Sequence, residues 1–447
     1  MLLNVLLLVI FASRASPAKI GYFWHITDIH LDTHYHSHKE NSCWRGGTSR
    51  LPLGKYGDYN CDSPWQLIES AAYAMKAKHG ENIEFVLWTG DALSNPSRHN
   101  PSHNLATVRN LTHLFGHVFS SQFVFPVLGH DDPRYVAEDT QPYRHVSSLW
   151  RHWLPSEALH TFNKGGFYSI EQKTRKLRLV ALNTNLWTGD EGEGEDPGGQ
   201  WAWLETLMAK SYRLKETIYL VGHMAPGTDE RLGNPPRPVM SPRHNARYLR
   251  LVRRYADIIT GQFFGHLHSD TFRVVYNEAG RPVSNIYLSP SLTPKRSSSG
   301  FNNPGIRLYK FNSDTGQVID YVQYYLDLAT ANQRESADWT IEYNLTTYYG
   351  FHKVSASEFH DLAESFTITD GLPLFARYYL VNSVSTSGLM TSMNQAHNHY
   401  CAITRLDTDQ FYNCLATAPS ALFSDAQPNS SISNTVFLVA FMISLLR

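Results

Sequence analysis

The clearest pattern along the chain is a repeated unit in which a short apolar run ends in Asp and His. Five runs rich in β-branched and aromatic residues have the length and composition of buried strands: IGYFWHIT, IEFVLWT, FVFPVL, TIYLV and IITGQFF. Each is followed by polar residues: Asp28-Ile-His30, Gly90-Asp91, Gly129-His130-Asp131-Asp132, Gly222-His223 and Gly265-His266-Leu267-His268. Because ligands bind outside the carboxyl ends of strands in open α/β sheets, this pattern predicts one site built from several strand ends.

Stretches with helical periodicity separate the apolar runs. Residues 63–66 (Ser-Pro-Trp-Gln) have the form of a capping box with Pro at the first helical position. An apolar helix face follows, formed by Leu67, Ile68, Ala71, Ala72 and Met75. Further helices are expected near residues 203–207 and over residues 243–255, the second with its basic side chains facing outward. Strands that alternate with helices in this way predict an α/β sheet protein.

The pattern changes near residue 330. Residues 331–420 contain no strand ends with Asp and His, and they are helical in part, for example over residues 355–366. A chain of 447 residues is long enough for one large domain and a smaller one. We therefore expect an α/β domain over residues 19–330 and a small, partly helical C-terminal domain over residues 331–424.

Composition and charge narrow the class of protein. Hydrophobic residues make up 42% and charged residues 18% of the chain, as in an ordinary globular protein. The 39 basic and 40 acidic side chains nearly balance, so we expect no nucleic-acid polymer as a partner. The 22 histidines are the unusual feature, and they indicate metal binding or pH-dependent chemistry.

Both ends of the chain have the composition of targeting signals. Residues 1–18 join an apolar stretch to small residues, as in a secretory signal peptide. At the other end, small residues at 424–426 precede a polar spacer and an apolar tail at 436–446. This order is typical of a GPI-attachment signal, with Ser424 as the expected attachment residue and residues 425–447 removed. The sequence thus predicts a secreted protein or one tethered to the extracellular face of the plasma membrane.

Cysteines and glycosylation sequons suit this compartment. The four cysteines form two clusters along the chain, Cys43 with Cys61 and Cys401 with Cys414. Pairing within each cluster closes short loops, although the sequence alone leaves three connectivities open. Disulfides persist outside the cytosol, so two are expected here. Asn110-Leu-Thr and Asn344-Leu-Thr are expected N-glycosylation sites in a secreted chain.

The polar strand ends offer enough ligands for two divalent ions. Two ions a few ångströms apart need about three to four protein ligands each, with one carboxylate shared between them. Asp28 and His30 point to the same side of an extended segment, because strand side chains alternate. His266 and His268 repeat this spacing, and Asp91 follows a glycine, as expected of a carboxylate at a crowded turn. The sequence therefore predicts a metal site rather than a set of hydrogen-bonded core histidines.

With these residues the chain resembles the calcineurin-like metallophosphoesterases, and more narrowly the acid sphingomyelinase-like phosphodiesterases of the GPI-anchored b type. The matching stretches run from about residue 20 towards the C-terminus: FWHITDIHLD, YNCDSPWQLIESAAYAMK, LWTGD, ALNTNLW, YLVGHMAPG, GQFFGHLHSDTFR and FNNPGIR. The resemblance implies a four-layer α/β/β/α sandwich with two zinc ions at the strand ends. It also implies phosphodiester hydrolysis by metal-activated hydroxide, with a histidine that protonates the leaving alcohol.

The resemblance also implies a ligand set, and the sequence departs from it at one motif. One zinc would be bound by Asp28, His30, Asp91 and His268, and the other by Asp91, His223, His266 and the Asn of a Gly-Asn-His-Asp motif. This chain has Gly129-His130-Asp131-Asp132 at that place. Aligned without a gap, His130 replaces the ligand Asn and Asp131 replaces the catalytic His. With the Asn deleted, His130 is the catalytic His instead.

Two functions follow from these residues. The first is a binuclear zinc phosphodiesterase that acts on nucleotide derivatives or phosphocholine lipids. The second is a catalytically impaired pseudoenzyme that binds a phosphorylated ligand, a lipid headgroup or a membrane partner. The second arises because Asn95 occupies the position of a further family His, and Asn cannot transfer a proton. Together with Asp131, this leaves the source of the leaving-group proton as the feature that separates the two functions.

Overall fold

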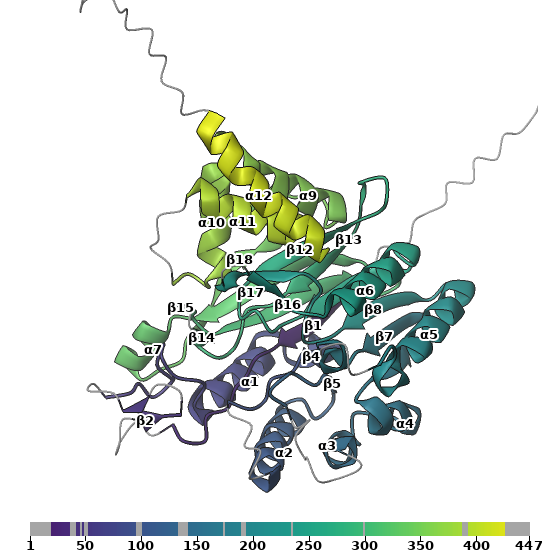
Figure 1. Cartoon of the computed structure of the whole chain (residues 1–447). Coiled ribbons are helices and arrows are strands. Elements are labelled where there is room, and N and C mark those ends of the chain that lie inside the picture. The colour runs from purple at the N-terminus through teal and green to yellow at the C-terminus, as the bar shows by residue number, and fades with distance from the viewer. Residues whose placement is uncertain are drawn as a thin grey trace, which may run out of the picture.

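Two mixed six-stranded sheets form the centre of the structure, a computed structural model (Figure 1). The first sheet has the strand order β18 (Trp339–Asn344), β17 (Val318–Leu326), β16 (Gly305–Asn312), β1 (Ile20–Ile26), β4 (Phe85–Trp88) and β5 (Phe123–Pro126). The second has the order β12 (Thr271–Tyr276), β13 (Pro282–Leu288), β11 (Ile259–Phe264), β8 (Thr217–Val221), β7 (Leu177–Ala181) and β6 (Tyr168–Gln172). All five strands expected from the apolar runs are present.

The structure describes residues 19–35, 42–44, 47–48, 52–94, 101–132, 142–172, 175–188, 194–233, 236–297, 300–386 and 392–424. The expected signal peptide at residues 1–18 and Asn95 lie outside the described residues. The expected C-terminal propeptide at residues 425–447 also lies outside them.

The strand directions bring the five polar strand ends to one place. In the first sheet β1, β4 and β5 run parallel, and in the second β7, β8, β11 and β13 run parallel. The carboxyl ends of β1, β4, β5, β8 and β11 are the ends that continue into the Asp and His residues. This arrangement places the predicted site at the strand ends of both sheets.

Aromatic rings fill the space between the two sheets. The Phe23 ring of β1 stacks on Phe85 of β4 at 4.7 Å, and it meets Phe263 of β11 edge-on at 5.3 Å. Tyr219 of β8 lies 5.0 Å from Phe263 between ring centroids. These side chains are almost completely buried, and rings packed edge-on and offset hold the sheets at a fixed separation.

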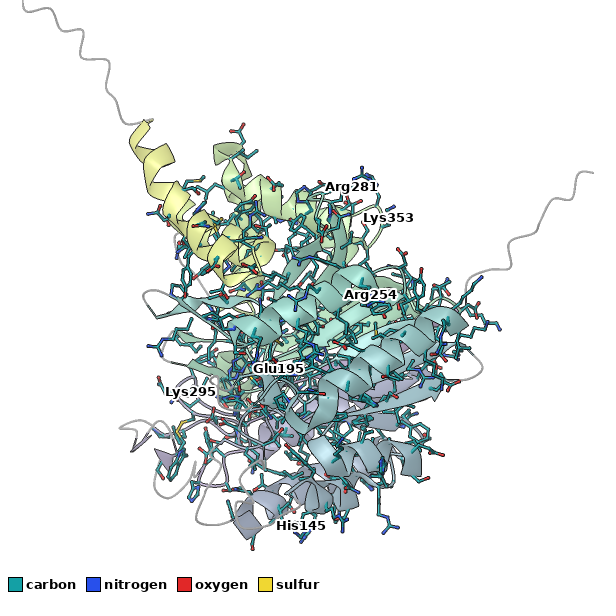
Figure 2. The ribbon with its side chains drawn as sticks, turned by 45° about the vertical axis from the view of Figure 1, so that its right-hand side comes forward. His145, Glu195, Arg254, Arg281, Lys295 and Lys353 are labelled. Carbon is teal, nitrogen blue, oxygen red and sulfur yellow. A yellow bond between two sulfur atoms is a disulfide. The ribbon has the colours of Figure 1, made fainter. Side chains whose placement is uncertain are left out.

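Helices cover the outer faces of both sheets and complete four layers. Beside the first sheet lie α1 (Trp65–His79), α2 (Pro101–Val118), α3 (Pro142–Trp150) and α4 (Ser156–Gly165). The second sheet is covered by α5 (Gln200–Leu214) and α6 (Pro242–Arg254). The expected apolar face of α1 is buried in full, and Arg254 of α6 points to solvent as expected (Figure 2).

The capping box expected at the start of α1 is not formed. Pro64 is the N-cap residue, and it has no side-chain cap. The backbone of Ser63 is used elsewhere, because its N–H donates to the carbonyl of His30 and its carbonyl accepts from the N–H of Asp32. Ser63 therefore ties α1 to the loop that follows β1 instead of capping the helix.

Helices near the C-terminus pack on β12 and β13, at the top of Figure 1. They follow α7 (Leu328–Arg334) and α8 (Leu345–Tyr349) and are α9 (Ala356–Glu364), α10 (Leu372–Asn382), α11 (Met393–Thr404) and α12 (Thr408–Ser424). β18 lies beyond residue 330 and still pairs with β17, so the first sheet extends past the expected domain boundary, which stays a prediction. Short strands complete the described chain: β2 (Ser42–Cys43), β3 (Gly47–Thr48), β9 (Thr228–Gly233), β10 (Pro236–Pro238), β14 (Lys295–Ser297) and β15 (Gly300–Phe301).

Both disulfides join cysteines within one cluster. Cys43 is bonded to Cys61, and Cys401 is bonded to Cys414. Of the three connectivities that the sequence leaves open, the structure has the local one. The first disulfide joins β2 to the segment that precedes α1, and the second joins α11 to α12.

Candidate metal centre

The seven side chains predicted as ligands lie together at the strand ends. Two groups whose candidate ligand atoms lie within 4.8 Å of one another contain all seven: Asp28, His30 and His268 form the first, and Asp91, His130, His223 and His266 form the second. Asp91 connects the groups, because its Oδ2 lies 3.0 Å from His223 Nε2 and 3.5 Å from His30 Nε2. A carboxylate shared by two neighbouring groups is the arrangement that a pair of metal ions requires.

Strained backbone turns aim these side chains inward. Five of the seven residues have φ in the left-handed region, which non-glycine residues rarely adopt: Asp28 (50°), His30 (44°), Asp91 (53°), His266 (68°) and His268 (53°). Glycines precede several of them for steric reasons. A Cβ on Gly129 would collide with the Asp91 carboxylate. Strain concentrated at one point of the molecule is typical of a functional site.

Backbone carbonyls orient three of the imidazoles. Nδ1 of His30 lies 2.9 Å from the carbonyl of Leu93, and Nδ1 of His223 lies 2.7 Å from that of Thr89. Nδ1 of His268 lies 2.9 Å from the carbonyl of Lys295, whose side chain is labelled in Figure 2. A ring that donates its Nδ1–H to a carbonyl presents Nε2 as an acceptor, which is how metal-binding histidines are commonly held.

Buried atoms at the centre lack hydrogen-bond partners among the described residues. Asp28 Oδ2 accepts from the Thr27 hydroxyl and from the His266 N–H, at 2.7 and 2.9 Å. Asp28 Oδ1 accepts no hydrogen bond, although His268 Nε2 is 3.3 Å away, and His266 Nδ1 also has no partner. A buried polar atom without a partner is costly, and a bound cation would satisfy both atoms. The residues present therefore fit a pair of divalent ions.

When no metal is bound, the charges at the centre favour ionised Asp28 and Asp91 together with a protonated His223. Burial opposes ionisation of Asp28, but His268 and His223 outweigh it and hold the Asp28 pKa well below its ordinary value. Burial likewise opposes ionisation of Asp91, and His130 and His223 keep the Asp91 pKa low. Although burial lowers it, the pKa of His223 is raised to about 10 by Asp91 and Asp28. Two ionised, buried carboxylates face the point where the imidazoles converge.

His130 belongs to the second group, and Asp131 lies at its edge. His130 Nδ1 is 2.7 Å from Asp91 Oδ2 and 3.3 Å from His223 Nε2. The Asp131 carboxylate is 3.8 Å from His30 Nδ1 and 3.7 Å from His130 Nε2, with 15% of the side chain exposed. His130 therefore lies among the candidate ligands, and Asp131 lies beside them.

Asp132 is a structural part of the centre to which sequence analysis assigns no role. Its buried carboxylate accepts from the backbone N–H groups of Asp91, Ala92 and Gly129, at 2.9, 2.6 and 2.7 Å. It thereby joins the loop after β5 to the loop after β4. Burial and the neighbouring Asp91 raise the Asp132 pKa to about 7 in the metal-free protein. The signal in the sequence is only its place at the end of the Gly129-His130-Asp131-Asp132 motif.

The remaining predicted sites lie away from this centre. Asn110 is exposed on α2, and Asn344 is half-buried at the end of β18. Ser424 is the last residue of α12. Within the described part of the chain, no helix combines the length and hydrophobicity needed to cross a bilayer.

Comparison with known families identifies two matching regions. The family model described as calcineurin-like phosphoesterase matches residues 21–270. The model described as acid sphingomyelin phosphodiesterase C-terminal region matches residues 281–420. The first region contains every strand end that supplies a candidate ligand.

Three curated relatives align over most of their length. Human acid sphingomyelinase-like phosphodiesterase 3b is 35% identical over 90% of this chain and 91% of its own. Human cyclic GMP-AMP phosphodiesterase SMPDL3A is also 35% identical, over 90% of this chain and 91% of its own. Sphingomyelinase phosphodiesterase C of Dictyostelium discoideum is 30% identical, over 89% of this chain and 93% of its own.

Proposed function

The chain belongs to the calcineurin-like phosphoesterases and, within them, to the acid sphingomyelinase-like phosphodiesterases, and from this premise we propose that it hydrolyses phosphodiesters with two zinc ions. Membership makes it a metal-dependent phosphodiesterase with a binuclear site. The observation that carries the zinc proposal is the Asp91 carboxylate, which contacts both imidazole-rich groups. Zinc suits donor sets of imidazole and carboxylate.

We assign one zinc to Asp28, His30, Asp91 and His268, and the other to Asp91, His130, His223 and His266. Two bound ions supply Lewis-acid activation of the phosphoryl group and of a water nucleophile. The protein positions the ligand side chains, because the left-handed turns and the contacts with backbone carbonyls hold them in place. His130 replaces an amide ligand, and imidazole is an equally acceptable donor.

In this proposal Asp131 donates the proton to the leaving alcohol. Its partly exposed carboxyl lies between His30 and His130, at the edge of the centre. A carboxyl group donates a proton only in its protonated form, so we expect esters with poor leaving groups to be hydrolysed faster towards acid pH. Esters whose leaving group needs no proton should not show this dependence.

The proposed substrates are small phosphodiesters, either nucleotide derivatives or phosphocholine lipids. The names of the human and Dictyostelium relatives support both classes, a cyclic dinucleotide for one and sphingomyelin for another. A site at the strand ends of two sheets suits a small ligand better than a polymer, and the near balance of charge agrees with this.

We also propose a place and a tether for the protein. Cleavage after residue 18 would send the chain into the secretory pathway, where Asn110 and Asn344 would be glycosylated. A GPI anchor on Ser424 would hold it at the extracellular face of the plasma membrane. Release of the protein from intact cells by a phosphatidylinositol-specific phospholipase tests the tether, and a protein that stays on the cells contradicts it.

The hydrolysis proposal is tested with the purified, zinc-loaded ectodomain. An alkyl phosphodiester is assayed from acid to neutral pH beside the variant Asp91→Asn, in which the shared carboxylate is lost. We expect turnover that the variant lacks. Equal rates for both proteins would contradict the proposal.

A second candidate function is that of a binding protein with the same fold and the same metal centre. The observation that favours it is the replacement of imidazole by carboxylate at Asp131, since a general acid contributes about 10²–10⁴-fold to such reactions. This candidate predicts two bound zinc ions, binding of inorganic phosphate or phosphocholine, and no turnover above the Asp91→Asn level.

A further inference from the structure

Helix α6 carries a concentration of positive charge away from the metal centre. Its 13 residues include no Asp or Glu and five arginines: Arg243, Arg247, Arg250, Arg253 and Arg254. The chain as a whole has a formal net charge of −1. The positive charge on this helix is therefore a local feature and does not reflect the composition of the protein.

The arginines in the first half of α6 have structural partners. Arg247 forms an ion pair with Glu205 of α5, at 2.7 Å, and donates to the carbonyl of Glu195, a residue labelled in Figure 2. Arg243 donates to the carbonyl of Gly194. These contacts attach the beginning of α6 to the segment before α5, and they account for the first two arginines.

The arginines in the second half are not neutralised in this way. Arg250 and Arg254 are exposed, and within the described chain neither has a carboxylate at ion-pair distance. Arg253 is half-buried and donates its Nε–H to the carbonyl of Tyr276, at 2.7 Å. The helix dipole favours cations in the last turn, where Arg253 and Arg254 lie, but Arg250 lies one turn earlier. The dipole alone therefore does not explain the cluster.

These three arginines line one side of a surface pocket of about 560 Å³, which we call the Arg250 pocket. The turn between β12 and β13 forms the other side with Asn277, Glu278 and Ala279. Arg281 is exposed in the same turn, where its carbonyl accepts from the N–H of Asn277; Arg254 and Arg281 are labelled in Figure 2.

The Arg250 pocket lies at the opposite edge of the second sheet from the metal centre. Helix α6 leads into the amino end of β11, and the turn after β12 leads into the amino end of β13. These two strands are parallel, and the candidate ligands His266 and His268 follow the carboxyl end of β11. The pocket is therefore a separate feature of the molecule.

We propose that the Arg250 pocket binds sulfate groups of a sulfated polysaccharide. Guanidinium groups bind oxyanions through paired N–H donors, and arginines at i, i+3 and i+4 present three such groups to one polyanion. Among the described lining residues Glu278 is the one carboxylate. Three positive charges outweigh this carboxylate together with the half negative charge of the helix end.

Two other polyanions fit the pocket less well. Proteins that bind single-stranded nucleic acid combine basic groups with aromatic rings on which the bases stack, and none of the described lining residues is aromatic. Anionic lipids are concentrated in the cytoplasmic leaflet of the plasma membrane, whereas we place this protein at the extracellular face. Sulfated polysaccharides occur at that face, and clusters of Lys and Arg are typical of heparin-binding proteins.

The test measures binding of heparin and of chemically desulfated heparin to the zinc-loaded ectodomain by calorimetry. We expect wild type to bind heparin more tightly than the desulfated polymer, and less tightly as salt is added. Arg250→Gln/Arg254→Gln should weaken heparin binding at least about tenfold, because two charged donors are lost. Arg250→Lys/Arg254→Lys should retain part of the affinity, since the charge remains and the paired donors do not.

The matched control is Arg151→Gln/Arg334→Gln, which removes two exposed arginines beside α3 and in α7. It should bind heparin like wild type, and all variants should retain the wild-type zinc content, which reports on the fold independently of hydrolysis. Equal losses in the control and in Arg250→Gln/Arg254→Gln, or equal affinity for both polymers, would overturn the proposal. A loss seen with an oligothymidylate or with phosphatidylserine vesicles, but not with heparin, would assign the pocket to nucleic acid or lipid instead.

Discussion

His130 Nδ1 lies 2.7 Å from Asp91 Oδ2, so the histidine of the altered motif faces the shared carboxylate of the metal centre. This contact leads to a prediction about metal content. His130→Ala should reduce bound zinc from two equivalents towards one, because the second group loses a donor and the first does not. His130→Asn, which supplies an amide oxygen at the same place, should retain more zinc than the alanine variant. Mass spectrometry of the purified, dialysed proteins measures the metal content.

His145→Ala is a suitable control, because this histidine lies on α3 and is not one of the candidate ligands (Figure 2). It should bind as much zinc as wild type. Two full equivalents in the His130→Ala variant would mean that His130 is not a ligand and would favour the alignment in which it is the catalytic histidine.

A substitution at Asp131 separates the enzyme from the binding protein. Asp131→His returns an imidazole to the catalytic position, and a general acid typically adds about 10²–10⁴-fold to the rate. We expect turnover of an alkyl phosphodiester to rise by at least about tenfold, with little change for a nitrophenyl ester, whose leaving group needs no proton. An equal change for both esters would show that the residue affects binding or metal content instead.

Local sequence signals predicted the parts of the fold that depend on one segment at a time. The five strands end in the expected Asp and His residues, and Leu67 to Met75 form a buried helix face, because period and burial are properties of a single element. The convergence of the strand ends was also predictable, since parallel strands of an α/β sheet present their carboxyl ends at one edge.

The predictions that failed or were missed depend on contacts between distant segments. Helix α1 begins at Trp65 with Pro64 as its N-cap residue, one residue later than a capping box at Ser63 requires, so Ser63 does not cap it. The Asp132 carboxylate bonds to N–H groups some 40 residues away, at Asp91 and Ala92. Backbone N–H groups carry no side-chain signature, and so the sequence cannot indicate which carboxylate will accept from them.

The stability of the loop junction at Asp132 is a third prediction. Asp132→Ala removes the acceptor for three backbone N–H groups, and buried donors left without a partner cost about 1–3 kcal/mol each where water cannot reach them. We expect the free energy of unfolding of the metal-free protein to fall by about 3 kcal/mol, measured by urea denaturation. The exposed Asp314→Ala should leave it unchanged. A similar effect for both variants would show that the three hydrogen bonds contribute little.

The pH dependence of zinc affinity follows from the charges at the centre. In the metal-free protein Asp28 and Asp91 are ionised, while the His223 pKa is raised to about 10, so His223 is protonated at neutral pH. A zinc ligand must be neutral imidazole, so binding has to displace this proton. The apparent affinity should therefore rise with pH below about 10, by up to about tenfold per unit for each proton released. Competition with a chelator at several pH values measures the slope.

Protonation of His223 also determines how the stability of the metal-free protein changes with pH. His223 has a folded pKa above its ordinary value of 6.5, so its ion pairs with Asp91 and Asp28 stabilise the metal-free protein fully below about pH 6.5. This stabilisation is lost as the pH rises towards 10, whereas the zinc-bound protein should show the opposite trend because zinc replaces the proton. His223→Gln should remove the loss of stability of the metal-free protein between about pH 7 and 10, along with the second zinc. If zinc affinity does not change with pH in wild type, His223 is already neutral in the empty site, and the ion-pair description of the centre is wrong.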